Sequence, residues 1–170
     1  GPSTAVVTRT ADNDGMIADS AIYVERLEAA GVELLAVVDT FADDTDMSGP
    51  ATQVIAENPD IVFTGQLGNT EVLMIAELRD RGYDGPIVGN LALAPQSIFE
   101  QAGDTLLGTV FPLAYFPGNP ASASQHFTEL WNANQDVEPD IFAAQGYMAV
   151  WMLLNGIKAA DSYDRAAVLA

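Results

Sequence analysis

Short apolar runs alternate with helical apolar stripes over the first two thirds of the chain. The apolar runs, which predict strands, lie at residues 4–8, 34–39, 61–63, 86–89 and 105–111. The stripes predict helices, one ending at Gly31, one capped by Asp46 or Ser48, one spanning 69–82 and one spanning 95–102. Strands that alternate with helices predict a doubly wound parallel α/β sheet. We expect five strands in the flavodoxin-like order 2-1-3-4-5.

The segment 58–82 shows this alternation most fully. Pro59 ends the preceding helix, and the apolar residues 61–63 form a strand that stops at a Thr-Gly-Gln sequence. Asn69 is the predicted N-cap of the next helix, because its side-chain oxygen can accept hydrogen bonds from free amides of the first turn. In parallel sheets, ligands bind beyond the carboxyl ends of the strands. Gln66 and Leu67 are therefore expected at a ligand-binding edge.

The last third of the chain has two longer predicted helices and no strand. They span residues 120–134 and 140–159, and the second has apolar residues around most of its circumference. These residues are Phe142, Tyr147, Met148, Val150, Trp151, Leu153, Leu154 and Ile157. A helix that is apolar all round is normally buried on several sides. We therefore expect further chain or a partner subunit to cover it.

Composition limits the classes of protein to which the chain can belong. Its 170 residues, of which 49% are hydrophobic, are enough for one domain with a packed core. The absence of cysteine excludes disulfides, thiol catalysis and cysteine-bound metals. The net charge is −18, and the few basic residues form no cluster, which excludes nucleic acid and disfavours anionic membrane surfaces as partners. Such acidity serves solubility or docks a basic partner.

Two acidic segments are candidate cation sites. Residues 12–15 (Asp-Asn-Asp-Gly) resemble part of a calcium-binding loop, but Thr10 and Ala21 stand where that loop needs its first and last ligands. We expect instead a polar loop in which an Asp or Asn caps the next helix. The acidic residues between 39 and 46 fit a solvated loop with one N-cap better than a cation site. We therefore predict no metal site.

No catalytic constellation is evident in the sequence. His126 is the only histidine, and it lies on the polar side of a helix without a partner at catalytic spacing. No glycine-rich phosphate loop follows any strand. The aromatic residues and methionines of the last long helix fit packing better than a cofactor pocket. We therefore expect neither a cofactor nor enzymatic activity.

The order of several short segments resembles that of a known family. The segments are Asp-Met-Ser at 46–48, Asn-Pro-Asp-Ile-Val-Phe at 58–63 with Gly65, Arg-Asp-Arg-Gly at 79–82 before Pro-Ile-Val-Gly at 86–89, Ala-Gly-Asp at 102–104 with Gly108, and Phe-Pro at 116–117 with Pro120. The helices at 125–131 and 143–154 also match. The chain resembles the type I periplasmic binding proteins, in particular the LivJ-like solute-binding subunits of branched-chain amino acid ABC transporters.

Proteins of this kind have two α/β lobes joined by three crossovers, with the ligand in the cleft between the lobes. The resemblance implies that the chain is a fragment. Residues 1–110 correspond to lobe two, 111–119 to a hinge crossover, and 120–170 to helices that in the family pack on lobe one. Helix 141–157 is then expected to be covered by a second copy, as a homodimer, or by a swapped packing.

The resemblance also implies ligand contacts in three βα loops of lobe two. The corresponding residues are Asp12, Asn13 and Asp14 in the first loop, Gln66 and Leu67 in the second, and Asn90 and Leu91 in the third, with Tyr115 at the hinge. Amino-acid binders carry aromatic residues in the first two loops and an acid in the third, where this chain has Asn13, Leu67 and Leu91. A buried ammonium without a counter-charge is costly, which disfavours a simple branched-chain amino acid. The side-chain amides of the three loops suit hydroxyl, amide or carbonyl groups.

The resemblance implies a non-catalytic function. We expect an extracytoplasmic solute-binding subunit of an ABC uptake transporter, whose partners are a small-molecule ligand and the membrane subunits. Its location would be periplasmic or extracellular, including the surface of the cell as a lipoprotein. Since a fold alone does not give a function, a ligand-sensing domain of a membrane receptor or regulator is the alternative.

Overall fold

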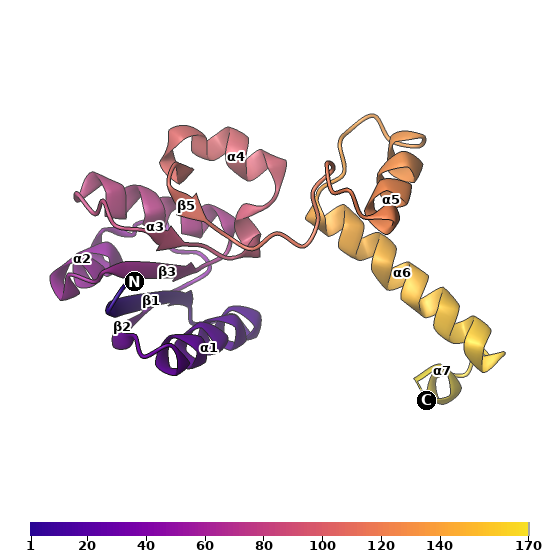
Figure 1. The fold of residues 1–170 in the computed structure, drawn as a ribbon, viewed down its shortest axis with the longest axis horizontal. Helices are drawn as coiled ribbons and strands as arrows, with labels where there is room; N and C mark the ends of the chain where they lie inside the picture. Colours follow the sequence, from indigo (N-terminus) through magenta and orange to yellow (C-terminus); the bar gives the residue numbers. More distant parts are fainter. Residues whose placement is uncertain (170) are drawn as a thin grey trace. The chain divides into compact units, whose positions relative to one another are not determined.

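The computed structural model describes residues 1–169 of the chain. Two compact units make up the chain, Gly1–Pro112 and Leu113–Ala170. The first unit contains the whole sheet, and the second contains helices only (Figure 1).

Five parallel strands form the sheet of the first unit. They are β1 (Thr4–Thr10), β2 (Glu33–Thr40), β3 (Ile61–Gly65), β4 (Ile87–Val88) and β5 (Thr109–Val110). The strand order is β2-β1-β3-β4-β5, which confirms the predicted flavodoxin-like order. Strand β1, next to the edge strand, pairs with β2 on one side and with β3 on the other, where Val6 is opposite Val62.

Helices cover both faces of this sheet, as predicted for a doubly wound fold. They are α1 (Asp14–Ala29), α2 (Ser48–Glu57), α3 (Gly68–Asp80) and α4 (Gln96–Ala102), with short 3-10 turns at η1 (Leu91–Leu93) and η2 (Gly103–Leu106). Figure 1 shows α1 on one side of the strands and α2 and α3 on the other. Side chains of β1 alternate between the faces, so that Val7 packs with Leu27 of α1 while Val6 joins Ile75 of α3. Burial on both faces explains the continuous apolar runs in the strands.

The predicted strand at 105–111 is mostly wrong. Only Thr109–Val110 pairs, with β4. Residues 103–106 turn as a 3-10 helix that buries Leu106 against the main core. Gly108 then adopts a φ of 78°, a conformation that side chains with a Cβ rarely adopt, and this reverses the chain into the short strand.

Two predicted helix caps are also wrong. Helix α3 begins at Gly68 with Leu67 as its N-cap, so Asn69 lies inside the helix. A Cβ at Gly68 would lie 2.9 Å from the carbonyl oxygen of Ala92, so this close approach requires glycine at the start of the helix. Neither Asp46 nor Ser48 is the N-cap of α2, because the buried Met47 holds that position.

The second unit consists of α5 (Ser122–Asn132), α6 (Ile141–Ala160) and α7 (Arg165–Leu169). Its core is small and aromatic. The ring of Phe127 packs within 6 Å, centroid to centroid, of the rings of Tyr115, Trp131 and Tyr147. Asp140 caps α6, since its carboxylate accepts a hydrogen bond from the Ala143 amide.

Most of the apolar surface of α6 is exposed in the described part of the chain. Met148, Val150, Trp151, Met152, Leu153 and Leu154 all have more than half of their surface accessible. Contiguous exposed apolar surface of this kind usually marks an interaction site. The prediction that another body covers this helix therefore remains a prediction. No helix within residues 1–169 has the length and hydrophobicity needed to cross a bilayer.

Candidate functional site

Three βα loops meet at the carboxyl edge of the sheet. The first follows β1, where Asn13 caps α1 by accepting a hydrogen bond from the Met16 amide at 3.0 Å, as the sequence predicted for this loop. Asp12 accepts a hydrogen bond from the Ala42 amide and so ties the first loop to the loop after β2. Asp12 and Asp14 are exposed, whereas Asn13 is half-buried.

The second loop, after β3, is built around Gln66, whose side chain is fully buried. Its Oε1 accepts a hydrogen bond from the Thr8 hydroxyl at 3.1 Å. Its Nε2 has no hydrogen-bond partner among the described residues. Leu67 follows as the half-buried N-cap of α3. The loop therefore holds one unused donor inside and an apolar side chain at its tip.

The third loop, after β4, is built around Asn90, which is also fully buried. Its Nδ2 donates to the backbone oxygen of Gln66 at 2.7 Å, and its Oδ1 accepts from the Ala92 amide at 2.6 Å. The Nδ2 also lies 3.6 Å from the sulfur of Met16. Leu91, at the tip, is 38% exposed. The structure thus joins the second and third loops through Asn90 and Gln66, and brings the first loop beside them through Met16.

The sequence interpretation missed a buried acid beneath these loops. Glu71 of α3 is fully buried. Its Oε1 accepts hydrogen bonds from the Thr64 hydroxyl at 2.7 Å and from the backbone amide of Asn90 at 3.0 Å. Burial, helped by the negative charge of Asp19, raises the pKa of Glu71 to about 8 against the lowering effect of these two hydrogen bonds. The signal was present: Glu71, Ile75 and Leu78 share the helical spacing of the inward stripe.

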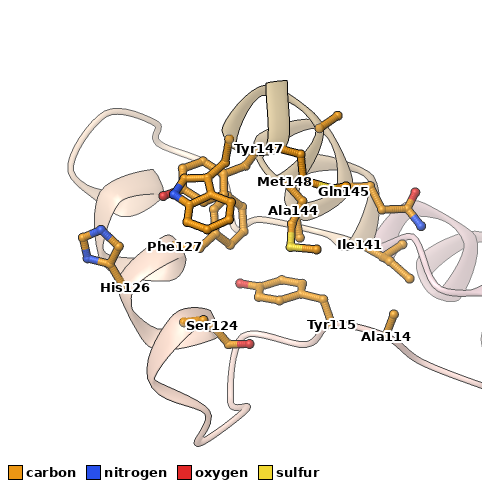
Figure 2. A pocket seen from close by; sticks show the side chains of 14 residues that line it. Ala114, Tyr115, Ser124, His126, Phe127, Ile141, Ala144, Gln145, Tyr147 and Met148 are labelled. Atoms are coloured by element: carbon orange, nitrogen blue, oxygen red, sulfur yellow. The ribbon is translucent and has the colours of Figure 1, made fainter. Parts of the chain in front are cut away.

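Tyr115 belongs to the second unit, and its hydroxyl is already used there. It lies 2.7 Å from the Thr128 hydroxyl, and only 6% of the residue is exposed. The same ring borders an apolar cavity of about 520 Å³ within that unit. Figure 2 shows Tyr115, Phe127 and Met148 around this cavity. The apolar lining fits the packing of an apolar body better than the binding of a polar solute.

The remaining polar candidates are structural or solvated. His126 is exposed, as predicted for a surface histidine. Asp39 pairs with Arg9 at 2.7 Å, and Asp46 accepts a hydrogen bond from the Ser48 amide. Within residues 1–169, no three His, Cys, Asp or Glu side chains are grouped closely enough to hold a metal ion.

Comparison with known proteins identifies the family of the chain. The family model described as "Periplasmic binding protein" matches residues 3–170, so the chain belongs to that family. Comparison with curated proteins gives no match.

Solved structures share the same fold. A leucine binding protein LivK from Thermotoga maritima is 23% identical, with a TM-score of 0.89 over 99% of this chain and 48% of that one. An ABC transporter substrate-binding protein from Sphaerobacter thermophilus is 22% identical, with a TM-score of 0.84 over 99% of this chain and 47% of that one. The branched-chain amino acid transporter substrate-binding protein LivJ from Streptococcus pneumoniae, in complex with isoleucine, is 21% identical, with a TM-score of 0.78 over 98% and 47%.

The chain spans about half the length of these structures. At this level of identity the likeness is one of fold. The residues that contact ligand in those proteins are therefore not transferred to this chain.

Proposed function

We propose that the chain provides one lobe of a non-catalytic, extracytoplasmic solute-binding subunit of an ABC uptake transporter. The observation that carries the proposal is the junction of the βα loops, in which Asn90 Nδ2 donates to the backbone of Gln66. Ligands of parallel α/β sheets bind at this edge. The membership of the periplasmic binding protein family supports the same function.

The proposed ligand is small and either polar or amino-acid-like. The loop tips offer the apolar side chains of Leu67 and Leu91, and Gln66 Nε2 is a donor with no partner within residues 1–169. An apolar surface with few placed polar groups is typical of small-molecule sites. The Asp12 and Asp14 carboxylates at the rim can attract a cationic group, which the apolar tips cannot.

The proposed role of the second unit is to connect the two lobes and to pack on the opposite one. In the proposed two-lobed protein, residues 111–119 are a hinge crossover, and α5 and α6 pack on the opposite lobe. The exposed apolar residues of α6 and the apolar cavity beside Tyr115 support this, because each is a surface that water solvates poorly. The ligand would then bridge the two lobes and stabilise a closed state.

Calorimetric titration of the complete gene product with leucine, isoleucine and a panel of polar solutes tests the proposal. Asn90→Ala removes the link between the loops and Leu91→Ala removes a loop tip, and both should weaken binding of whichever solute binds. A lost hydrogen bond of about 0.5–1.5 kcal/mol corresponds to roughly two- to tenfold in affinity.

The matched control is Gln53→Ala, which changes an exposed amide on α2, away from the loops. It should leave the affinity unchanged. Leu91→Ala keeps the test decisive if Asn90→Ala fails to fold, because Leu91 is partly exposed. Wild-type affinity in Leu91→Ala and in a folded Asn90→Ala protein would remove this sheet edge from the ligand site.

A further inference from the structure

One buried carboxyl group joins the second and third loops. Glu71 Oε1 accepts hydrogen bonds from Thr64, the fourth residue of β3, and from the amide of Asn90 in the loop after β4. Both donors therefore converge on the same oxygen atom. The other carboxyl oxygen, Oε2, is buried and has no hydrogen-bond partner among the described residues.

The backbone of the third loop approaches this carboxyl group closely. A Cβ at Gly89 would lie 2.9 Å from Glu71 Oε1 and 2.5 Å from Leu93 Cδ1, so a side chain there would displace these two buried side chains. The amide of Gly89 is held separately by the Val110 oxygen at 2.8 Å. The position of Asn90 is thus set by the sheet on one side and by Glu71 on the other.

From Asn90 the hydrogen bonds continue to the other loops. The Asn90 side chain donates to the backbone of Gln66, and the Gln66 side chain accepts from Thr8 of β1. Glu71, Asn90, Gln66 and Thr8 are all fully buried. Because these groups are buried, water does not reach them to replace a broken hydrogen bond. The network therefore holds the loops together as a unit.

Within residues 1–169, no Lys or Arg side chain forms a salt bridge with Glu71. The titratable groups that face it are Asp19 and Tyr23, both on α1, and the Tyr23 hydroxyl lies 3.5 Å from the Gly89 oxygen. Strand β3 contributes Thr64, the loop after β4 contributes Asn90, and η1 contributes Leu93, and none of these side chains titrates. A carboxylate at this site would be an unpaired buried charge, which is costly. The neutral acid, with its proton on Oε2, keeps both hydrogen bonds to Oε1.

We propose that Glu71 is a positioning residue for the ligand loops, which as a neutral carboxylic acid fixes Asn90 against β3. The inference rests on the proposed function only for the statement that these loops contact ligand. The raised pKa of Glu71, about 8, agrees with the neutral form at neutral pH. Ionisation would then occur at mildly alkaline pH.

The first experiment needs no ligand. In the 170-residue chain, NMR follows the Glu71 side-chain carboxyl carbon and the Asn90 amide from pH 5 to pH 10. We expect both signals to shift together with a midpoint near 8, because the Asn90 backbone amide donates to the carboxyl group that titrates. Glu71→Gln should abolish the transition of the Asn90 amide, because its side-chain oxygen can accept the same two hydrogen bonds without ionising. Glu77→Gln changes a partly exposed acid on the same helix and should retain the transition.

Two results would overturn the proposal in this experiment. One is a Glu71 carboxyl group that ionises near its ordinary value of 4.5. The other is an Asn90 amide that does not respond when Glu71 ionises. Either result decides the proposal whether or not the protein binds an amino acid.

The second experiment uses isoleucine and leucine as probes of the complete gene product. If only the neutral form binds, the apparent Kd should rise about tenfold for each pH unit above the midpoint. Glu71→Gln should bind with similar affinity at pH 7 and lose this rise. A pH-independent wild-type Kd between pH 7 and pH 9 would refute the effect on binding. Absence of binding at every pH would count against an amino acid as the ligand in the proposed function. In that case the NMR experiment by itself decides whether Glu71 positions the loops.

Discussion

Replacing Glu71 by glutamine should change how the stability of the first unit depends on pH. The substitution keeps the shape of the side chain and an oxygen that accepts from Thr64 and Asn90. It removes the only proton in this network of hydrogen bonds that titrates near neutral pH. The free energy of unfolding of the variant and of the wild-type chain should therefore diverge as the pH rises.

The sign and size follow from the pKa of Glu71, which is about 8 in the folded chain against an ordinary value of 4.5. Between these values the folded state holds a proton that the unfolded state has released. The contribution of this group is thus fully present below pH 4.5 and is lost as the pH rises to 8. The slope is at most about 1.4 kcal/mol per pH unit, and the total is on the order of 5 kcal/mol. Between pH 4.5 and 8, the free energy of unfolding of Glu71→Gln should therefore rise by this amount relative to that of the wild type.

Urea unfolding at several pH values between 5 and 8.5 measures the difference. Trp131 and Trp151 both lie in the second unit, so tryptophan fluorescence reports on that unit. The NMR signals of β1 and β3 amides report on the first. Glu77→Gln is the control, and removing its exposed pair with Arg81 should cost only a few tenths of a kcal/mol at any pH. If the free energy of unfolding of Glu71→Gln depends on pH in the same way as that of the wild type, the assignment of a neutral buried acid is refuted.

Further substitutions test the cap of α1, the core and the exposed face of α6. Asn13→Ala should lower the free energy of unfolding by about 1 kcal/mol through loss of the α1 cap, as measured by urea unfolding; no change would refute the cap. Ile75→Ala, in the core, should cost about 2–5 kcal/mol in the same assay, whereas Ile22→Ala, 54% exposed on α1, should cost well under 1 kcal/mol. Changing Met152 and Leu154 together to glutamine should reduce self-association of the chain in sedimentation velocity, because both are exposed on α6. Unchanged association would show that this face is not the contact.

The architecture of the first unit could be predicted because local patterns determine it. The inner strands β1 and β3 are largely buried on both faces, so their apolar runs stand out between polar loops. The strand order follows from the alternation of strands and helices together with right-handed crossovers. The exposed helix α6 was recognisable from its sequence for a related reason, since its apolar residues cover most of its circumference.

The details that failed depend on contacts between distant residues. The start of α3 is set by the approach of Gly68 to the Ala92 oxygen, which no cap rule contains. The strand predicted at 105–111 had the right composition, but most of it is a turn that buries Leu106. Glu71 was the largest omission. Its partner Asn90 is 19 residues further along the chain, and only the spacing with Ile75 indicated that the acid points inward.

The most direct test of the central claim is native mass spectrometry of the complete gene product, with amino acids and other small polar solutes added in turn. The account predicts one small molecule bound per protein, retained from the cell or taken up from the panel, and lost or weakened when Leu91 is replaced by alanine. A folded protein that carries no adduct and takes up none of the solutes would contradict it.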